Sequence, residues 1–262
     1  MNPLLSKSNT LLRYGMVHLL PSILNLYTVN EFPKSGGSWI GEMVGRGLEI
    51  PFPRNCFPKF GSCIMHGHYL KGWGMRQTLV VWRDGRDVMV SWYHHCLFEN
   101  ELNNRRLVKL VRRDLAFSNY QDVKKNLPDF IEYAFSSRSH LGFTWSDFVN
   151  HWHDKPGVTY VKYEDILKDT PGELTRICLE LGGKELGYDQ AQNIADIFSF
   201  TKQSGRQPGE EKKDSFMRKG IVGDYRNFFT HKTGEIFDNY AGRELVKLGY
   251  EQNRQWWVSA LG

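Results

Sequence analysis

A short loop of small residues joins a predicted strand to a predicted helix near the beginning of the chain. Residues 27–32, YTVNEF, alternate in polarity and are rich in β-forming side chains, which predicts a strand. Residues 33–38 interrupt the strand with a glycine pair, and residues 39–48 then form a helical pattern that Ser38 can cap. A strand, a glycine loop and a helix in this order are typical of an α/β fold.

Further strands alternate with helices along the rest of the chain. The apolar run 78–82 is typical of a buried parallel strand, and shorter β-rich segments occupy residues 63–65 and 158–161. Helical patterns follow at residues 88–98, 145–152, 171–181, 189–198 and 234–248. We expect an α/β fold: a single P-loop-like domain over residues 1–262, with a central, mostly parallel sheet flanked by helices.

Three other segments have distinct characters. Residues 1–26 are an N-terminal helical segment, which we expect to pack on the core; a helix lying on a membrane surface is the alternative. The segment is too short and too polar to span a bilayer, and it lacks a signal-peptide pattern. Residues 104–126 resemble a helical insert, and the polar segment 201–219 is predicted to be a mobile lid loop.

Charge and cysteine content narrow the functional classes. The formal net charge of +5 suits an anionic ligand, but no basic block is long enough to predict a nucleic-acid arm. The four cysteines form no C-x-x-C pair, so we expect free thiols in a reducing compartment and a cytoplasmic location. We find no cluster of metal ligands in the sequence and expect no metal requirement.

The loop after the first strand has the chemistry of an anion site. A helix N-terminus presents unpaired N–H groups and a positive dipole end, and glycines allow these groups to converge on one anion. Lys34 adds a positive charge, while Ser35 and Ser38 add hydroxyl donors. The loop is not a Walker A motif, because its lysine precedes the glycines. The alternative is an ordinary turn with a surface lysine.

This loop, Pro33–Trp39, resembles the 5′-phosphosulfate loop of the sulfotransferases that use 3′-phosphoadenosine 5′-phosphosulfate (PAPS). The family pattern is P-K-S-G-T-T-W, and Gly37 and Ser38 replace its two threonines. The resemblance implies a donor-binding set made of Lys34, Ser35, Gly36, Gly37, Ser38 and Trp39.

Two further segments resemble the family in the same order. The segment from Arg83 to Tyr93 has the family spacing R-x-x-x-D-V-x-x-S-x-Y, which implies that Arg83 and Ser91 bind the 3′-phosphate of PAPS. Arg86 and Asp87 are expected to be structural. Residues 218–230 are similar to R-K-G-x-x-G-D-W-K-N-x-F-T, which implies that Arg218, Lys219 and Gly220 cover the same phosphate from the lid.

Two weaker matches complete the donor set. Tyr163 lies in a segment that is similar to the family's Y-E-D motif. Phe200 falls where the family often has an aromatic residue near the adenine, although a core position explains it equally well.

The family's catalytic histidine lies in a K-T-H-L segment after the second strand. Alignment on that strand gives His68 the role of base and places His66 where the family has a second lysine. Lys34 would neutralise the leaving oxygen. His66 could replace the missing lysine only when protonated; otherwise Lys71 or Lys59 takes its place, or the enzyme depends more on Lys34.

The resemblance implies a PAPS-dependent sulfotransferase. It would act on the hydroxyl or amine of a small-molecule, lipid or carbohydrate acceptor, without nucleic acid, and peripheral membrane contact and oligomeric state are left open. The variable segment 103–138 and residues near Tyr69, Trp73 and Trp92 are expected to select the acceptor. Two rivals remain: a P-loop phosphoryl transferase, and a nucleotide-binding protein without catalysis.

Overall fold

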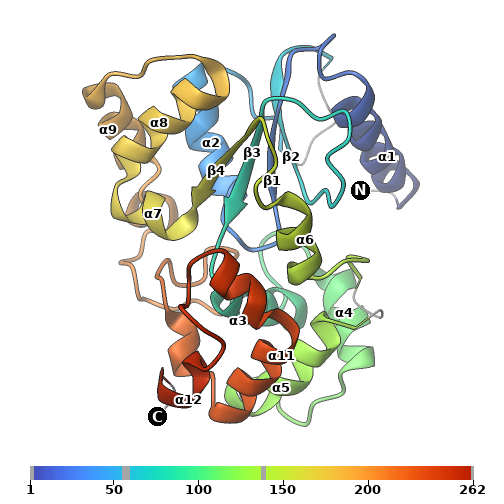
Figure 1. Ribbon diagram of the computed structural model, residues 1–262. Coiled ribbons are helices and arrows are strands. Elements are labelled where there is room, and N and C mark those ends of the chain that lie inside the picture. The colour runs from blue at the N-terminus through green and yellow to red at the C-terminus, as the bar shows by residue number, and fades with distance from the viewer. Residues whose placement is uncertain (1–2, 55–59, 137–139, 261–262) are drawn as a thin grey trace. The chain divides into compact units, whose positions relative to one another are not determined.

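The computed structural model describes residues 3–54, 60–136 and 140–260, and it divides into two compact units (Figure 1). The first unit contains residues 1–83 and 152–203, and the second contains residues 84–151 and 204–262. The prediction of a single domain remains a prediction.

The first unit is built on a parallel sheet with the strand order β2-β1-β3-β4. Its strands are β1 (Leu26–Glu31), β2 (Cys63–Gly67), β3 (Thr78–Trp82) and β4 (Val158–Lys162). The predicted α/β class is therefore confirmed. The second strand extends further than predicted, because β2 pairs with β1 as far as Gly67, so His66 lies within the strand.

Helices cover both faces of this sheet (Figure 1). Tyr27 and Val29 of β1 pack with the helices on one face, while Leu26 packs with the helix on the other, as the two-residue period of a strand requires. The first face contacts α2 (Gly37–Leu48), α7 (Tyr163–Lys168), α8 (Thr170–Gly182) and α9 (Tyr188–Ile197). The second face contacts α1 (Pro3–Leu19), where Met16 and Val17 are buried, as expected for a helix packed on the core.

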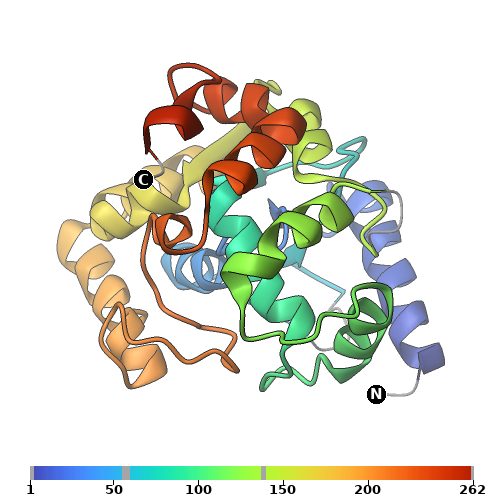
Figure 2. The same cartoon turned by 90° about the horizontal axis from the view of Figure 1, so that it is seen from below.

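The second unit is helical. It contains α3 (Gly85–Leu97), α4 (Arg105–Asp114), α5 (Val123–Ala134), the 3₁₀ turn η1 (Asp224–Asn227), α11 (His231–Lys247) and α12 (Trp256–Ala260). In the view from below, the light-green α5 lies beside the teal α3 (Figure 2). The predicted insert is thus two helices separated by a loop, and the short α12 follows the helix predicted to be last.

The helix α6 (Trp145–Trp152) buries the three aromatic residues predicted to share one face. Trp145 contacts Phe237 of α11 in the second unit, whereas the Trp152 indole donates a hydrogen bond to the carbonyl of Tyr69 in the first. The expectation that this whole face packs on the sheet is wrong for Trp145, because aromatic residues of α11 provide its partner.

Three smaller expectations can be compared with the structure. The predicted lid segment begins later than expected, because α10 (Phe200–Ser204) includes its first residues, and the non-helical stretch begins at Gly205. Cys63, Cys96 and Cys178 are buried thiols, while Cys56 lies outside the described residues. Among the helices that the structure describes, none has the length and apolar character needed to cross a bilayer.

Candidate active site

The loop that follows β1 adopts a conformation for which glycine is required. Gly36 has a φ of 98°, and a Cβ atom there would lie 2.6 Å from Cδ2 of Tyr163. Gly36 is followed directly by α2, so the N–H groups of the first helical turn lie at the loop. Lys34 also has a positive φ, of 74°. The loop thus lies at the carboxyl end of a parallel strand and at a helix N-terminus, the position expected for the predicted anion site.

Arg83 and two aromatic side chains surround this loop. The Arg83 guanidinium donates to the carbonyl oxygen of Lys34 at 2.9 Å and lies 4.4 Å from the centre of the Tyr163 ring. The Trp39 ring meets Tyr163 edge-on with 5.9 Å between centroids, and its indole donates to the carbonyl of Phe198. The first unit therefore brings together three of the predicted donor-binding side chains, Trp39, Arg83 and Tyr163, beside the backbone of Lys34.

Glu31, the last residue of β1, is a site residue that the sequence analysis missed. One oxygen of its buried carboxylate accepts the Gly37 N–H at 2.6 Å, and the other lies 2.9 Å from Nε2 of His66. Its backbone carbonyl lies 2.9 Å from Nδ1 of His68. An acidic residue at the end of a buried strand, next to a glycine loop, is the signal that could have indicated it.

The ionisation of this group follows from its surroundings. Burial raises the pKa of Glu31, but the hydrogen bonds and charges of His66, with smaller contributions from His68 and Gly37, outweigh it, and the net pKa is lowered. Burial and then the charge of His66 lower the pKa of His68. The His68 ring is nevertheless exposed to solvent, which weakens the effect of burial. An ionised Glu31 and a neutral His68 are expected near pH 7.

No cluster of metal ligands was expected from the sequence, but three side chains in the structure lie close enough to hold a metal ion. Glu31, His66 and His68 each offer one ligand atom, and these atoms lie within 4.8 Å of one another. Two imidazoles and a carboxylate suit a divalent ion such as Zn²⁺. Glu31 is distant in sequence from the two histidines, and it meets them because β1 and β2 are neighbours in the sheet.

In the second unit, α3 carries Ser91 and two structural charged residues. Arg86 is buried in ion pairs with Asp84 and Glu251. Asp87 accepts hydrogen bonds from the backbone N–H groups of Gly223 and Tyr225. These contacts support the structural roles expected for Arg86 and Asp87. Ser91 is buried on the same helix.

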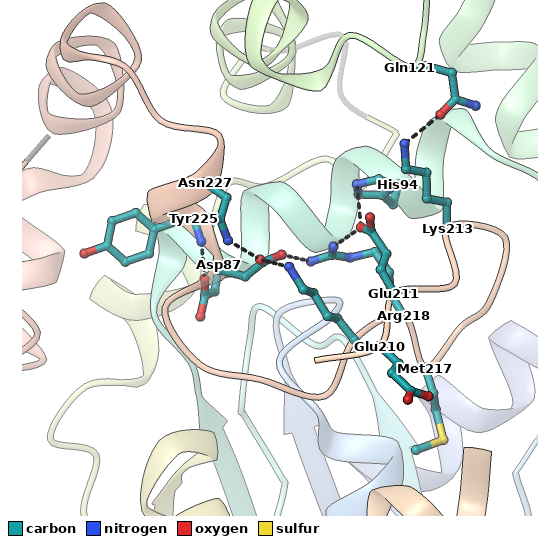
Figure 3. A network of polar contacts seen from close by, with 12 residues as sticks. Asp87, His94, Gln121, Glu210, Glu211, Lys213, Met217, Arg218, Tyr225 and Asn227 are labelled. Carbon is teal, nitrogen blue, oxygen red and sulfur yellow. Dashed lines mark hydrogen bonds and ion pairs between the residues drawn. The ribbon is translucent and has the colours of Figure 1, made fainter. Parts of the chain in front are cut away.

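The end of the predicted lid is held in a network of charged side chains (Figure 3). Arg218 forms ion pairs with Glu211 and Asp224, and the Lys219 ammonium lies 2.6 Å from Asp224. The ring of His94 lies 3.9 Å from the same Glu211 carboxylate. Two of the predicted phosphate-binding cations therefore have carboxylate partners.

The structure also bears on the remaining predicted residues. Gly220 has a φ of 65°, a conformation that favours glycine in the turn after Lys219. Phe200 begins α10 and is partly buried. Lys71 is exposed, and Lys59 lies outside the described residues.

Trp73 is 51% exposed, whereas Trp92 is 2% exposed and packs against Phe130, so Trp92 is a core residue.

The parallel sheet defines an α/β protein, and a glycine loop joins the end of β1 to the N-terminus of α2. The sequence profile of the sulfotransferase domain family matches residues 76–249, about two thirds of the chain, and the chain belongs to this family. The matched region includes Arg83, Ser91 and the lid residues Arg218–Gly220. It does not include the loop 33–39, His66 or His68.

Individual relatives support the same assignment. Sulfotransferase 1E1 of Cavia porcellus is 26% identical over 187 residues, covering 66% of this chain and 56% of the relative. Sulfotransferase 2A1 of Mus musculus is 25% identical over 268 residues, covering 84% and 86%. The chain thus spans just over half the length of some curated relatives and most of others.

A solved structure shows that the fold is shared. Mouse sulfotransferase SULT7A1, complexed with PAP, superposes with a TM-score of 0.66 at 18% identity, covering 91% of this chain and 90% of that one.

Proposed function

We propose that this protein transfers a sulfuryl group from PAPS to a hydroxyl or amine acceptor and releases adenosine 3′,5′-bisphosphate (PAP). The loop 33–38 carries this proposal, because it places Lys34 and a helix N-terminus at the end of β1, and Arg83 from the end of the neighbouring β3 donates to the Lys34 carbonyl. Solved sulfotransferases of the same fold contain PAP, which supports the choice of donor. A cytoplasmic location belongs to the same proposal.

The donor roles follow the family resemblance residue by residue. The loop N–H groups other than those of Ser35 and Gly37, which donate to Phe32 and Glu31, would hold the 5′-phosphosulfate together with the hydroxyls of Ser35 and Ser38. Trp39, Tyr163 and Phe200 are aromatic candidates for contacts with the nucleoside. Arg83, Ser91, Arg218, Lys219 and Gly220 are proposed to bind the 3′-phosphate. A phosphate dianion can replace the carboxylates that now pair with Arg218 and Lys219.

The proposed reaction is a direct, in-line displacement at sulfur. The acceptor atom forms a bond to sulfur as the bond between sulfur and the bridging oxygen breaks, and that oxygen leaves with the 5′-phosphate of PAP. Lys34 neutralises the charge that develops on the leaving oxygen. The acceptor's proton passes to His68. Because Nδ1 of His68 faces the Glu31 carbonyl, Nε2 is the nitrogen available to receive it.

His66 has a different role from the lysine it replaces. Its Nε2 atom is directed at the carboxylate of Glu31, so this nitrogen is engaged away from the sulfuryl group. We therefore assign the principal charge stabilisation at sulfur to Lys34.

The acceptor is proposed to be a small molecule. Trp73 is exposed and stacks on His18 with 4.6 Å between ring centroids, and Tyr14 and Tyr69 lie beside them. An aromatic surface of this kind suits a flat or sugar-like ring. Core packing of Tyr69, whose ring is partly buried, is the alternative for that residue.

A transfer assay tests this proposal. Protein and ³⁵S-labelled PAPS are incubated with a panel of phenols, steroids, amines and sugars, and labelled product is measured. We expect Lys34→Ala to abolish transfer, while Lys168→Ala, an exposed lysine of α7, leaves it unchanged. Binding of PAP without transfer to any acceptor would indicate a nucleotide-binding protein. Phosphoryl transfer from ATP would indicate the alternative of a P-loop phosphoryl transferase.

A further inference from the structure

Of the positions that depart from the family pattern near the proposed site, Glu31 contacts two, Gly37 and His66. Gly37 stands where the family has threonine, and its N–H donates to one carboxylate oxygen of Glu31 at 2.6 Å. His66 stands where the family has lysine, and its Nε2 lies 2.9 Å from the other oxygen. Both departures therefore meet at a single buried side chain.

The space around Glu31 explains the glycine. A Cβ atom on residue 37 would lie 2.8 Å from Cδ of Glu31 and 3.1 Å from its Oε2. Non-bonded carbon atoms do not approach so closely, so the family's threonine at position 37 is incompatible with this placement of Glu31. Glu31 and Gly37 are consequently a matched pair.

The hydrogen bonds also determine where the protons lie. An ionised carboxylate can only accept, so the His66 nitrogen that faces Glu31 carries a proton. The backbone carbonyl of Glu31 can only accept as well, so His68 carries its proton on Nδ1. One residue thus sets the tautomer of both imidazoles, His66 through its carboxylate and His68 through its backbone.

We infer that Glu31 is a positioning residue that joins the anion loop to β2 and fixes His66 in the tautomer with its proton on Nε2. For its kinetic consequence, the inference rests on the sulfuryl transfer proposed above. Glu31 would hold Gly37, and with it the loop that carries Lys34, at a set distance from the strand that leads to His68. Correct spacing of these groups is what an in-line transfer requires.

Histidine NMR of the Glu31→Gln variant tests the tautomer directly. The amide oxygen of the introduced side chain accepts the Gly37 N–H, which leaves its NH₂ group facing His66. Two donors cannot face each other, so His66 must move its proton from Nε2 to Nδ1. His68 keeps its tautomer, because the backbone carbonyl is unchanged, and it serves as the internal reference.

The spectra are recorded on protein with ¹⁵N-labelled histidine, near pH 8, after treatment with EDTA, and signals are assigned with His66→Asn and His68→Asn. Glu49→Gln, at the exposed C-terminal end of α2, is the matched control and should change neither ring. A His66 signal that is identical in wild type and Glu31→Gln would overturn the inference. A wild-type pattern that changes when EDTA removes bound metal would also overturn it, because a metal would then orient the ring.

Kinetics separate a positioning role from a purely structural one. We expect Glu31→Ala, which removes the contacts with both Gly37 and His66, to lower kcat about tenfold, since small misplacements of reacting groups have effects of this order or larger. The dissociation constant of PAP should change less than about twofold. This is a smaller change in binding free energy than the roughly 1.4 kcal/mol that a tenfold change represents. An unchanged kcat would contradict the role of Glu31. If the wild-type protein neither binds PAP nor transfers sulfate, the proposed function fails, while the NMR result still decides the tautomer.

A double-mutant cycle tests the pairing of Glu31 with Gly37. Gly37→Thr alone should lower the melting temperature, because the new Cβ atom meets the carboxylate. In the Glu31→Ala background the same substitution should lower it much less. Equal losses in both backgrounds would show that the two positions are independent and would contradict the matched pair.

Discussion

Gly36 is the residue at which the loop leaves least room for change. Its φ of 98° disfavours any side chain, and the Tyr163 ring occupies the place of a Cβ atom. We expect Gly36→Ala to reduce the free energy of unfolding by about 1–3 kcal/mol, the usual cost of such backbone strain. Urea unfolding would measure the loss. Gly187→Ala is the control, because its φ is −65° and nothing lies near its Cβ position; equal effects would contradict this explanation.

Glu211 is an internal competitor for the proposed phosphate site, because its carboxylate pairs with Arg218 (Figure 3). Removing that charge should make Arg218 more available to a phosphate. We expect Glu211→Gln to raise the affinity for PAP about threefold, in line with the modest energy of partly exposed ion pairs. Titration calorimetry would measure this.

The adjacent Glu210→Gln is the matched control, because the Glu210 carboxylate accepts the backbone N–H of Gln207 rather than pairing with Arg218. An affinity for PAP that falls in Glu211→Gln would show that the carboxylate supports the site rather than competing for it.

Among the elements, η1 and the segment before it depend on Asp224. Burial raises the pKa of this carboxyl, but Lys219 and Arg218 lower it by more, so the folded-state pKa lies below its ordinary value of about 3.9. A carboxyl of this kind stabilises the fold above its unfolded pKa, and the contribution is lost as the pH falls through the folded pKa.

We therefore expect Asp224→Asn to cost about 3 kcal/mol at pH 7, near the lower end for breaking a buried pair. The difference from wild type should shrink as the pH falls below about 4, where the wild-type carboxyl becomes protonated. Urea unfolding at several pH values measures both effects. Asp214→Asn, an exposed aspartate of the same segment, should show neither. A difference that is constant with pH would contradict the ion-pair explanation.

The strands could largely be predicted from the sequence, and the errors have physical causes. The runs that form β1 and β3 are dominated by β-forming residues, so local preference and tertiary structure agree. The end of β2 was missed because His66 and Gly67 have weak strand preference and are held in place by pairing with β1. Glu31 was missed because alternation predicts a strand but does not reveal that the next strand supplies a histidine opposite the carboxylate.

At the scale of the whole molecule, the family profile supports some of the proposed site residues, and local motifs support the others. The family profile begins at residue 76, so it includes Arg83 but not the loop that contains Lys34. The assignment of Lys34, His66 and His68 therefore depends on the motif resemblance and on the contacts around Glu31. The net charge of +5 is consistent with an anionic donor, without identifying it.

Titration calorimetry with PAP tests directly whether this chain has a site for the PAPS nucleotide. AMP, which lacks the 3′-phosphate, is the comparison ligand. Arg83→Ala removes the proposed 3′-phosphate ligand, and Arg76→Ala, an exposed arginine before the other end of β3, is the matched control. We expect micromolar binding of PAP to wild type and Arg76→Ala, with much weaker binding of AMP and of PAP to Arg83→Ala. Equal binding of PAP and AMP, or no binding of either, would contradict this expectation.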